Sequence, residues 1–159
     1  MNFRLFKGRE NDVMKMTLLR FAVGAVFLWF GVDKWVHPSA WYGWMPSWLT
    51  SFLHGGALDS FIYLNGIFEV AVGLAFVANR FVQIAAASAG AFLFLIALTV
   101  GANEVTIRDN ALLGVCIVLF VNAGEKAKWH LSPRAITTIY SAYIAYLFIY
   151  GVLYLRVAP

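Results

Sequence analysis

The sequence is poor in charged residues, and this shortage excludes a water-soluble globule. Only 13% of its 159 residues are Asp, Glu, Lys or Arg, whereas 62% are hydrophobic. A soluble domain of this size usually carries about 25% charged residues, so too little polar surface remains to cover the chain in water. The length allows one compact domain. We therefore expect an all-α integral membrane protein in contact with a lipid bilayer.

Cysteine is also nearly absent, which limits the chemistry that one subunit can perform. The single cysteine, Cys116, lies in the apolar run LLGVCIVLF, and there is no CxxC pair. One thiol cannot form a disulfide within a chain, so dithiol chemistry within one subunit is excluded. No metal site is predicted, because His37 and His54 lack the spacing of metal ligands. No haem is predicted, because no expected helix carries a buried histidine.

Five hydrophobic runs approach the length of about 20 residues that a spanning helix needs. They cover residues 16–36, 59–79, 81–101, 106–123 and 135–155. The strictly apolar part of the fourth run is only 111–123, a length at which buried and re-entrant segments also occur. Whether the fourth run crosses fully stays open. We expect no cleaved signal peptide, because Asp33 and Lys34 follow the first run in place of small residues.

The basic residues predict the orientation, since cytoplasmic loops carry Lys and Arg in excess. With five spans and a cytoplasmic N-terminus, eight of them lie inside and three outside, with Arg20 within the first helix. The inner ones are Arg4, Lys7, Arg9, Lys15, Arg80, Lys126, Lys128 and Arg134, and the outer ones are Lys34, Arg108 and Arg156. Topology thus explains the net charge of +4, and no nucleic-acid partner is expected.

This topology divides the chain into four parts in the cell membrane. They are a cytoplasmic segment 1–15, a four-helix membrane part 16–123, a cytoplasmic loop 124–134, and an additional helix with a short outer tail in 135–159. The C-terminus is then expected outside.

The segment between the first two runs, residues 38–58, is rich in aromatic residues. Trp41, Tyr42, Trp44 and Trp48 follow the first helix closely. Trp and Tyr collect at the boundary between membrane and water, so we expect an outer interfacial segment that lies over the bundle. Two interpretations stay open: an ordinary aromatic anchor, or a cover over a ligand that Trp41 and Trp44 contact.

Glu69 is the most costly residue in the predicted spans. It lies near the middle of the second run, where a charge costs roughly 2.5–3.5 kcal/mol on insertion scales. Glu69 is therefore either protonated or paired with a donor from another helix, and it is a candidate for proton handling. Arg20 is one candidate partner. The alternative for Arg20 is that it extends to the inner head groups.

Charged and polar residues from distant parts of the sequence are expected at the outer face. They are Asp33, Lys34, His37, His54, Glu104, Arg108 and Asp109. One interpretation is a structural network of ion pairs. The other is a polar pocket beneath the tryptophans that binds a head group or a small anion. In that case the candidate ligand-binding residues are Arg20, Lys34, His37, Trp41, Trp44, Arg108 and Asp109.

Two patterns predict how the helices pack. Gly24 and Gly31 are seven residues apart, as are Gly66 and Gly73, and small residues at such spacing allow close helix contact. In the last run, four tyrosines form a stripe that should face protein or a polar cavity. They are Tyr143, Tyr146, Tyr150 and Tyr154, and they are a candidate interface for a partner subunit.

Three of these segments together resemble the DoxX-like membrane family, which includes the DoxD-type subunit of thiosulfate:quinone oxidoreductase. The first contributes Arg20, Gly24, Phe27, Gly31, Lys34 and Pro38; the second Gly66, Glu69 and Gly73; the RDNALLG motif Arg108, Asp109 and Gly114. The resemblance covers about residues 16–123. It implies a four-helix membrane bundle, to which this chain adds a fifth C-terminal transmembrane helix and the outer interfacial segment.

The resemblance also implies a function in membrane redox chemistry, because the family is linked to quinone reduction, sulfur-compound oxidation and oxidative stress. One hypothesis is an oxidoreductase subunit that passes electrons from a small reductant to membrane quinone, with no intrinsic cofactor. A second is a non-catalytic accessory subunit of a respiratory or oxygenase complex, docked through its extra helix or assembled as a homo-oligomer. A third is a small-molecule or proton transporter. Whether the chain is an enzyme stays open.

Overall fold

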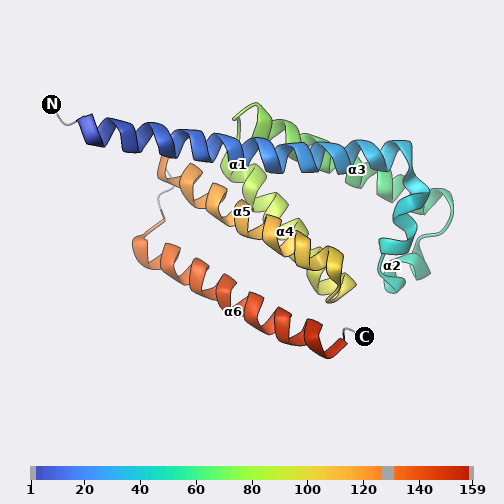
Figure 1. Cartoon of the computed structure of the whole chain (residues 1–159). Helices are drawn as coiled ribbons and strands as arrows, with labels where there is room; N and C mark the ends of the chain where they lie inside the picture. Colours follow the sequence, from blue (N-terminus) through green and yellow to red (C-terminus); the bar gives the residue numbers. More distant parts are fainter. Residues whose placement is uncertain (1–2, 127–130, 158–159) are drawn as a thin grey trace.

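The computed structural model describes residues 3–126 and 131–157, and the described part of the chain is helical without a β-strand (Figure 1). The elements are α1 (Phe3–Val36), η1 (Pro38–Trp44), α2 (Ser47–Phe52), α3 (Gly56–Val77), α4 (Val82–Val100), α5 (Glu104–Lys126) and α6 (Pro133–Val157). The expected all-α membrane bundle is confirmed.

Four described helices are long and apolar enough to cross a bilayer: α1 from Asp12 onward, α3, α4 and α6. The chain is therefore a multi-pass membrane protein. α5 has 23 residues but begins with the polar stretch that contains Glu104, Arg108 and Asp109, and it is not one of the four. The number of spans and the orientation therefore stay predictions.

α1 begins well before the hydrophobic run at residue 16. Its 34 residues correspond to about 50 Å of helix, whereas the hydrocarbon core is about 30 Å thick. Figure 1 shows its N-terminal part extending beyond the other helices. Hydropathy indicates only the part of α1 that enters lipid. The helix also includes the polar segment before residue 16, because that segment contains no proline to end it.

Glycines bring α1 and α3 into backbone contact. A Cβ atom on Gly24 would lie 3.1 Å from the Gly73 carbonyl oxygen, and one on Gly31 would lie 2.8 Å from that of Gly66. These four glycines form the close contact that their spacing predicted. Because the earlier glycine of α1 meets the later glycine of α3, the two helices run antiparallel.

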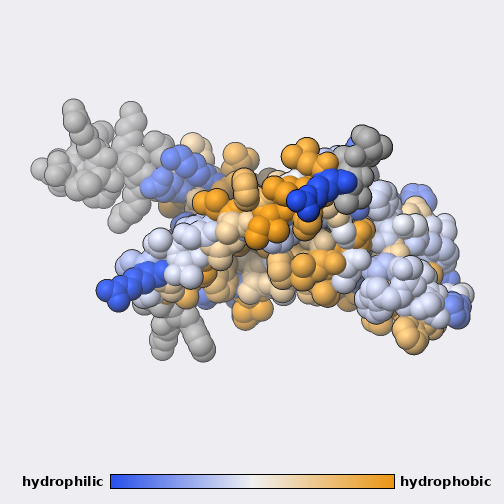
Figure 2. Space-filling model, turned by 90° about the horizontal axis from the view of Figure 1, so that it is seen from below, coloured by the Kyte–Doolittle hydropathy of each residue, from blue (hydrophilic) through white to orange (hydrophobic). Residues whose placement is uncertain are grey.

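Small residues also pack α4 against α5. Ala86, Ala89 and Gly90 of α4 are buried, and Leu113 and Cys116 of α5 belong to the same core. α1 and α3 form one pair of helices and α4 and α5 the other, with the core between them. Hydrophobic residues cover the middle of the face shown in Figure 2, and hydrophilic residues lie toward its ends.

α6 packs beside α5 through the tyrosine stripe (Figure 1). Tyr143 donates a hydrogen bond to the Asn110 carbonyl, Tyr146 donates to the Asn110 side chain, and Tyr150 donates to Gly101. Gly114 of the RDNALLG motif leaves room for Tyr143, since a Cβ atom there would lie 2.6 Å from its hydroxyl.

The tyrosines therefore face protein, as expected, but this protein is their own chain. The hydroxyls of Tyr143, Tyr146 and Tyr150 find their acceptors on α5 and at the end of α4. α6 thus uses these three residues to pack on the bundle, and a partner interface at the stripe stays a prediction. Tyr154 is half-buried at the far end of the stripe.

Candidate functional site: the outer cavity

Lys34 of α1 and Glu69 of α3 form a buried ion pair within the bundle. The Lys34 Nζ lies 2.6 Å from Glu69 Oε2, and the two side chains are only 4% and 6% exposed. Helical side chains lean toward the N-terminus of their helix. Because α1 and α3 are antiparallel, Lys34 leans into the bundle and Glu69 leans toward the end where Lys34 lies.

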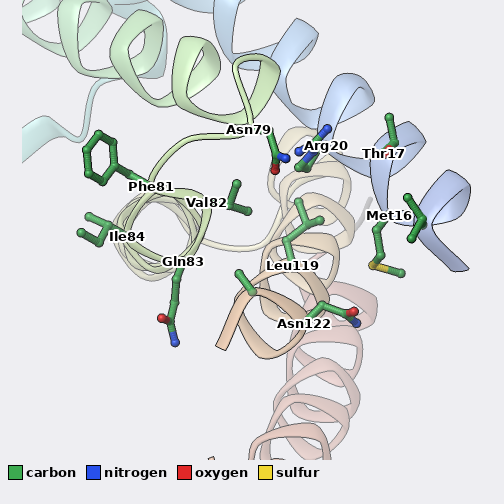
Figure 3. A pocket seen from close by; sticks show the side chains of 12 residues that line it. Met16, Thr17, Arg20, Asn79, Phe81, Val82, Gln83, Ile84, Leu119 and Asn122 are labelled. Atoms are coloured by element: carbon green, nitrogen blue, oxygen red, sulfur yellow. The ribbon is translucent and has the colours of Figure 1, made fainter. Parts of the chain in front are cut away.

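The partner of Glu69 is thus Lys34, and the Arg20 pairing considered from the sequence is wrong. Arg20 lies one turn before Gly24, which packs on Gly73 near the end of α3. Its side chain leans toward the N-terminus of α1 and away from Glu69. It lies in a second pocket, together with Asn79 and Gln83 at the connection between α3 and α4 (Figure 3).

Trp41 of η1 covers the ion pair. The Lys34 Nζ lies 3.7 Å from the centre of the Trp41 ring, which places the ammonium over an aromatic face. The indole of Trp41 donates a hydrogen bond of 3.0 Å to Asp33 Oδ2 and packs edge-on against Phe30. The interfacial segment is thereby fixed to the end of α1.

A second acidic and basic pair comes from α5. Asp109 is only 7% exposed, and Arg108 Nη2 lies 3.3 Å from its Oδ1. The Arg108 guanidinium also lies 5.3 Å from the centre of the Phe30 ring. α5 thus directs a buried carboxylate and a half-exposed cation toward the end of α1.

These groups line one cavity of about 330 Å³. We call it the outer cavity, because it lies at the end of the bundle that the distribution of basic residues predicts to be outside. Its charged residues are Lys34, Glu69, Arg108 and Asp109, and its walls are largely aromatic and aliphatic, with Trp41, Trp44, Phe30 and Phe92 among them. Ligand sites are typically apolar clefts of about 300–1,000 Å³ with a few convergent polar groups. The outer cavity has this character.

Most of the residues singled out from the sequence therefore meet in the outer cavity: Lys34, Trp41, Trp44, Glu69, Arg108 and Asp109. His37 does not point into it. Its Nδ1 lies 2.9 Å from Asp33 Oδ1, and its side chain is 65% exposed. His54 and Glu104 are also exposed.

Asn65 is a cavity residue that the sequence reasoning missed. It lies one helical turn before Glu69 on α3 and lines the outer cavity. Its Oδ1 is buried and has no hydrogen-bond partner among the described residues. A polar residue four positions before a buried acid, on the same face of an apolar helix, is the signal that could have identified it.

Tyr42 fixes the interfacial segment to α3. Its hydroxyl donates a hydrogen bond to the carboxylate of Asp59 in the first turn of α3. This bond raises the pKa of the Tyr42 phenol, so Tyr42 stays a neutral donor at physiological pH. The segment over the outer cavity is therefore attached at two adjacent residues, by Trp41 to α1 and by Tyr42 to α3.

Comparison with known proteins supports the resemblance seen in the sequence. Residues 15–102 match the model of the DoxX family. No curated protein and no solved structure matches the chain. The matched part contains the glycines of α1 and α3 and the Lys34–Glu69 pair, whereas the RDNALLG motif lies after it. The match covers more than half of the 159 residues, and the chain therefore belongs to the DoxX family.

Proposed function

We propose that the outer cavity binds the ring of a quinone, and that the chain is the quinone-reducing membrane component of an oxidoreductase system. The observation that carries this proposal is the buried Lys34–Glu69 pair, which lines an aromatic cavity together with Asn65, whose amide oxygen has no partner among the described residues. Membership of the DoxX family supports a membrane location for this chemistry.

The polar groups of the cavity match both redox states of such a ring. A quinone offers carbonyl oxygens that accept hydrogen bonds, and the Lys34 ammonium is a donor. A quinol offers hydroxyl groups that donate, and the unpartnered Asn65 Oδ1 is an acceptor. The flat walls of Trp41 and Phe30 suit an aromatic ring.

Reduction of a quinone consumes two electrons and two protons. Lys34 is the proton donor of the pair, because Glu69 accepts its short hydrogen bond as a carboxylate. Lys34 can give one proton to a ring oxygen, and water supplies the second proton and the proton that restores the Lys34 ammonium. Asp109 is a second buried acid in the same cavity. The electrons come from a small reductant, such as a sulfur compound, or from a partner subunit.

The test is binding and reduction of a short-chain quinone by the purified full-length protein in detergent. Binding is measured by quenching of tryptophan fluorescence, and reduction is measured with thiosulfate or a thiol as reductant. Lys34→Gln and Glu69→Gln should weaken binding by about tenfold or more, because each removes a charge-assisted hydrogen bond in the cavity.

Glu104→Gln is the matched control, since Glu104 is an exposed acid at the start of α5. This variant should bind quinone as the wild type does. Equal binding by all four proteins would contradict a quinone site at the Lys34–Glu69 pair. Binding without reduction by any reductant would favour the accessory-subunit hypothesis. In that case docking would use the apolar outer face of α6, with residues such as Phe148.

A further inference from the structure

A second pocket, which we call the Arg20 pocket, lies at the opposite end of the bundle from the outer cavity. Its volume is about 410 Å³, and α1, the beginning of α4 and the end of α5 surround it (Figure 3). Its polar residues are Thr17, Arg20, Asn79, Gln83 and Asn122. The proposed quinone site uses none of them.

Arg20 supplies an unpaired donor to this pocket. Its Nε atom is buried and has no hydrogen-bond partner among the described residues. The described residues that line the pocket carry no negative charge, and Asn79 lies beside Arg20 in Figure 3. A buried charged donor without an acceptor is costly. A guanidinium forms paired hydrogen bonds with phosphate or carboxylate oxygens, so the missing partner is an anionic oxygen group.

The position of the pocket along the bundle favours a lipid as the source of this anion. Arg20 is level with the end of α3, where Ala78 caps the helix. The Arg20 pocket therefore lies at the depth of the head groups. Phe81 and Ile84, which line the same pocket, are 75% and 69% exposed. Such apolar side chains at the pocket rim suit the upper part of an acyl chain.

We propose that the Arg20 pocket binds the phosphate group of an anionic phospholipid, whose acyl chains lie over Phe81 and Ile84. The Arg20 guanidinium contacts the phosphate oxygens, and the side-chain amides of Asn79, Gln83 and Asn122 add neutral donors. An anionic lipid is favoured over a zwitterionic one, because the described lining residues offer no acid to pair with a choline or an ethanolamine group.

The test uses the full-length protein, purified in detergent and stripped of lipid. Its thermal unfolding midpoint is measured while phosphatidylglycerol, phosphatidylcholine or inorganic phosphate is added. Phosphatidylglycerol should raise the midpoint of the wild type more than the other two. Arg20→Gln should need about tenfold more phosphatidylglycerol, or a still higher excess, for the same rise in the midpoint, because it removes the charged donor.

Arg80→Gln is the matched control, since Arg80 is an exposed arginine at the same connection and does not line the pocket. It should respond to phosphatidylglycerol as the wild type does. An equal lipid response in Arg20→Gln and the wild type, or an equal loss in both variants, would overturn the proposal. A full response to inorganic phosphate alone would overturn the lipid as the source of the phosphate.

Asn79→Asp keeps the test decisive if Arg20→Gln does not fold. Aspartate has nearly the same shape as asparagine and would place a negative charge beside Arg20, since Asn79 lies next to Arg20 in Figure 3. This charge should pair with the guanidinium and repel phosphate. The variant should therefore need about tenfold more phosphatidylglycerol for the same rise in the unfolding midpoint. An unchanged response would place the lipid elsewhere.

Discussion

Lys34 and Glu69 form the most buried ion pair among the described residues. Each is nearly free of contact with solvent, and the short distance between their charged atoms offsets the cost of burying them. Removal of one partner leaves an uncompensated charge in an apolar cavity, whereas removal of both leaves apolar surface. The pair is therefore a sensitive measure of the structure of the outer cavity.

Lys34→Met should destabilise the folded protein by about 3 kcal/mol or more, since breaking a buried pair leaves its partner unpaired. The double variant Lys34→Met with Glu69→Leu should recover most of that loss. Both free energies of unfolding can be measured by denaturation in detergent. A double variant as unstable as the single one would contradict the pairing.

The contact of α1 with α3 determines which cation meets Glu69. The glycine contacts place the backbones of the two helices next to each other at two levels, Gly24 with Gly73 and Gly31 with Gly66. Any atom larger than hydrogen at these positions would separate the helices. It would also displace Lys34 from Glu69, because those residues come from the same two helices.

Gly31→Ala should destabilise the protein by about 1–3 kcal/mol, the usual cost of overpacking, because its Cβ atom would lie 2.8 Å from the Gly66 carbonyl oxygen. The same substitution should weaken quinone binding. Gly56→Ala is the control, since a Cβ atom there meets nothing within 4 Å. Equal unfolding midpoints for the two variants would show that α1 and α3 are not in backbone contact.

The position of α6 depends on tyrosine hydroxyl groups more than on burial. Most of its large apolar residues are exposed, whereas Tyr150 is buried and bonded to Gly101 and Thr106. Tyr150→Phe should cost about 1 kcal/mol and speed hydrogen exchange along α6 in detergent. Tyr154→Phe serves as the control and should leave exchange unchanged. Unaltered exchange in Tyr150→Phe would mean that other contacts position α6.

For the whole molecule, the sequence allowed the helical membrane class, the glycine contacts and the meeting of Lys34, Trp41, Arg108 and Asp109 to be predicted. These features follow from hydropathy, from spacing, and from a topology that places the ends of several helices at one depth. The partner of Glu69 could not be predicted in this way. It depends on the relative level of α1 and α3 and on the direction in which their side chains lean.

The contacts of the tyrosine stripe also could not be predicted from the sequence. The spacing of the tyrosines shows that their hydroxyls share one face of the helix. The same spacing is expected whether the hydrogen-bond acceptors lie in the same chain or in a partner subunit. Only the fold shows that Asn110, Thr106 and Gly101 lie within reach of the tyrosines. Asn110 and Thr106 were missed for the same reason.

The topology of the whole chain is tested by cysteine labelling in intact cells, in a background where Cys116 is replaced by alanine. With five spans, Ser39→Cys should react with an impermeant reagent from outside, whereas Ser132→Cys should react only after the membrane is opened. If α5 did not cross the membrane, both cysteines would react from outside.

The most direct test of the central claim is an experimental structure of the full-length protein in lipid with a short-chain quinone. The account predicts that the ring lies in the outer cavity, with one ring oxygen within hydrogen-bond distance of Lys34 Nζ and with Lys34 still next to Glu69. A quinone bound elsewhere, or a Glu69 side chain turned toward the acyl chains, would contradict it.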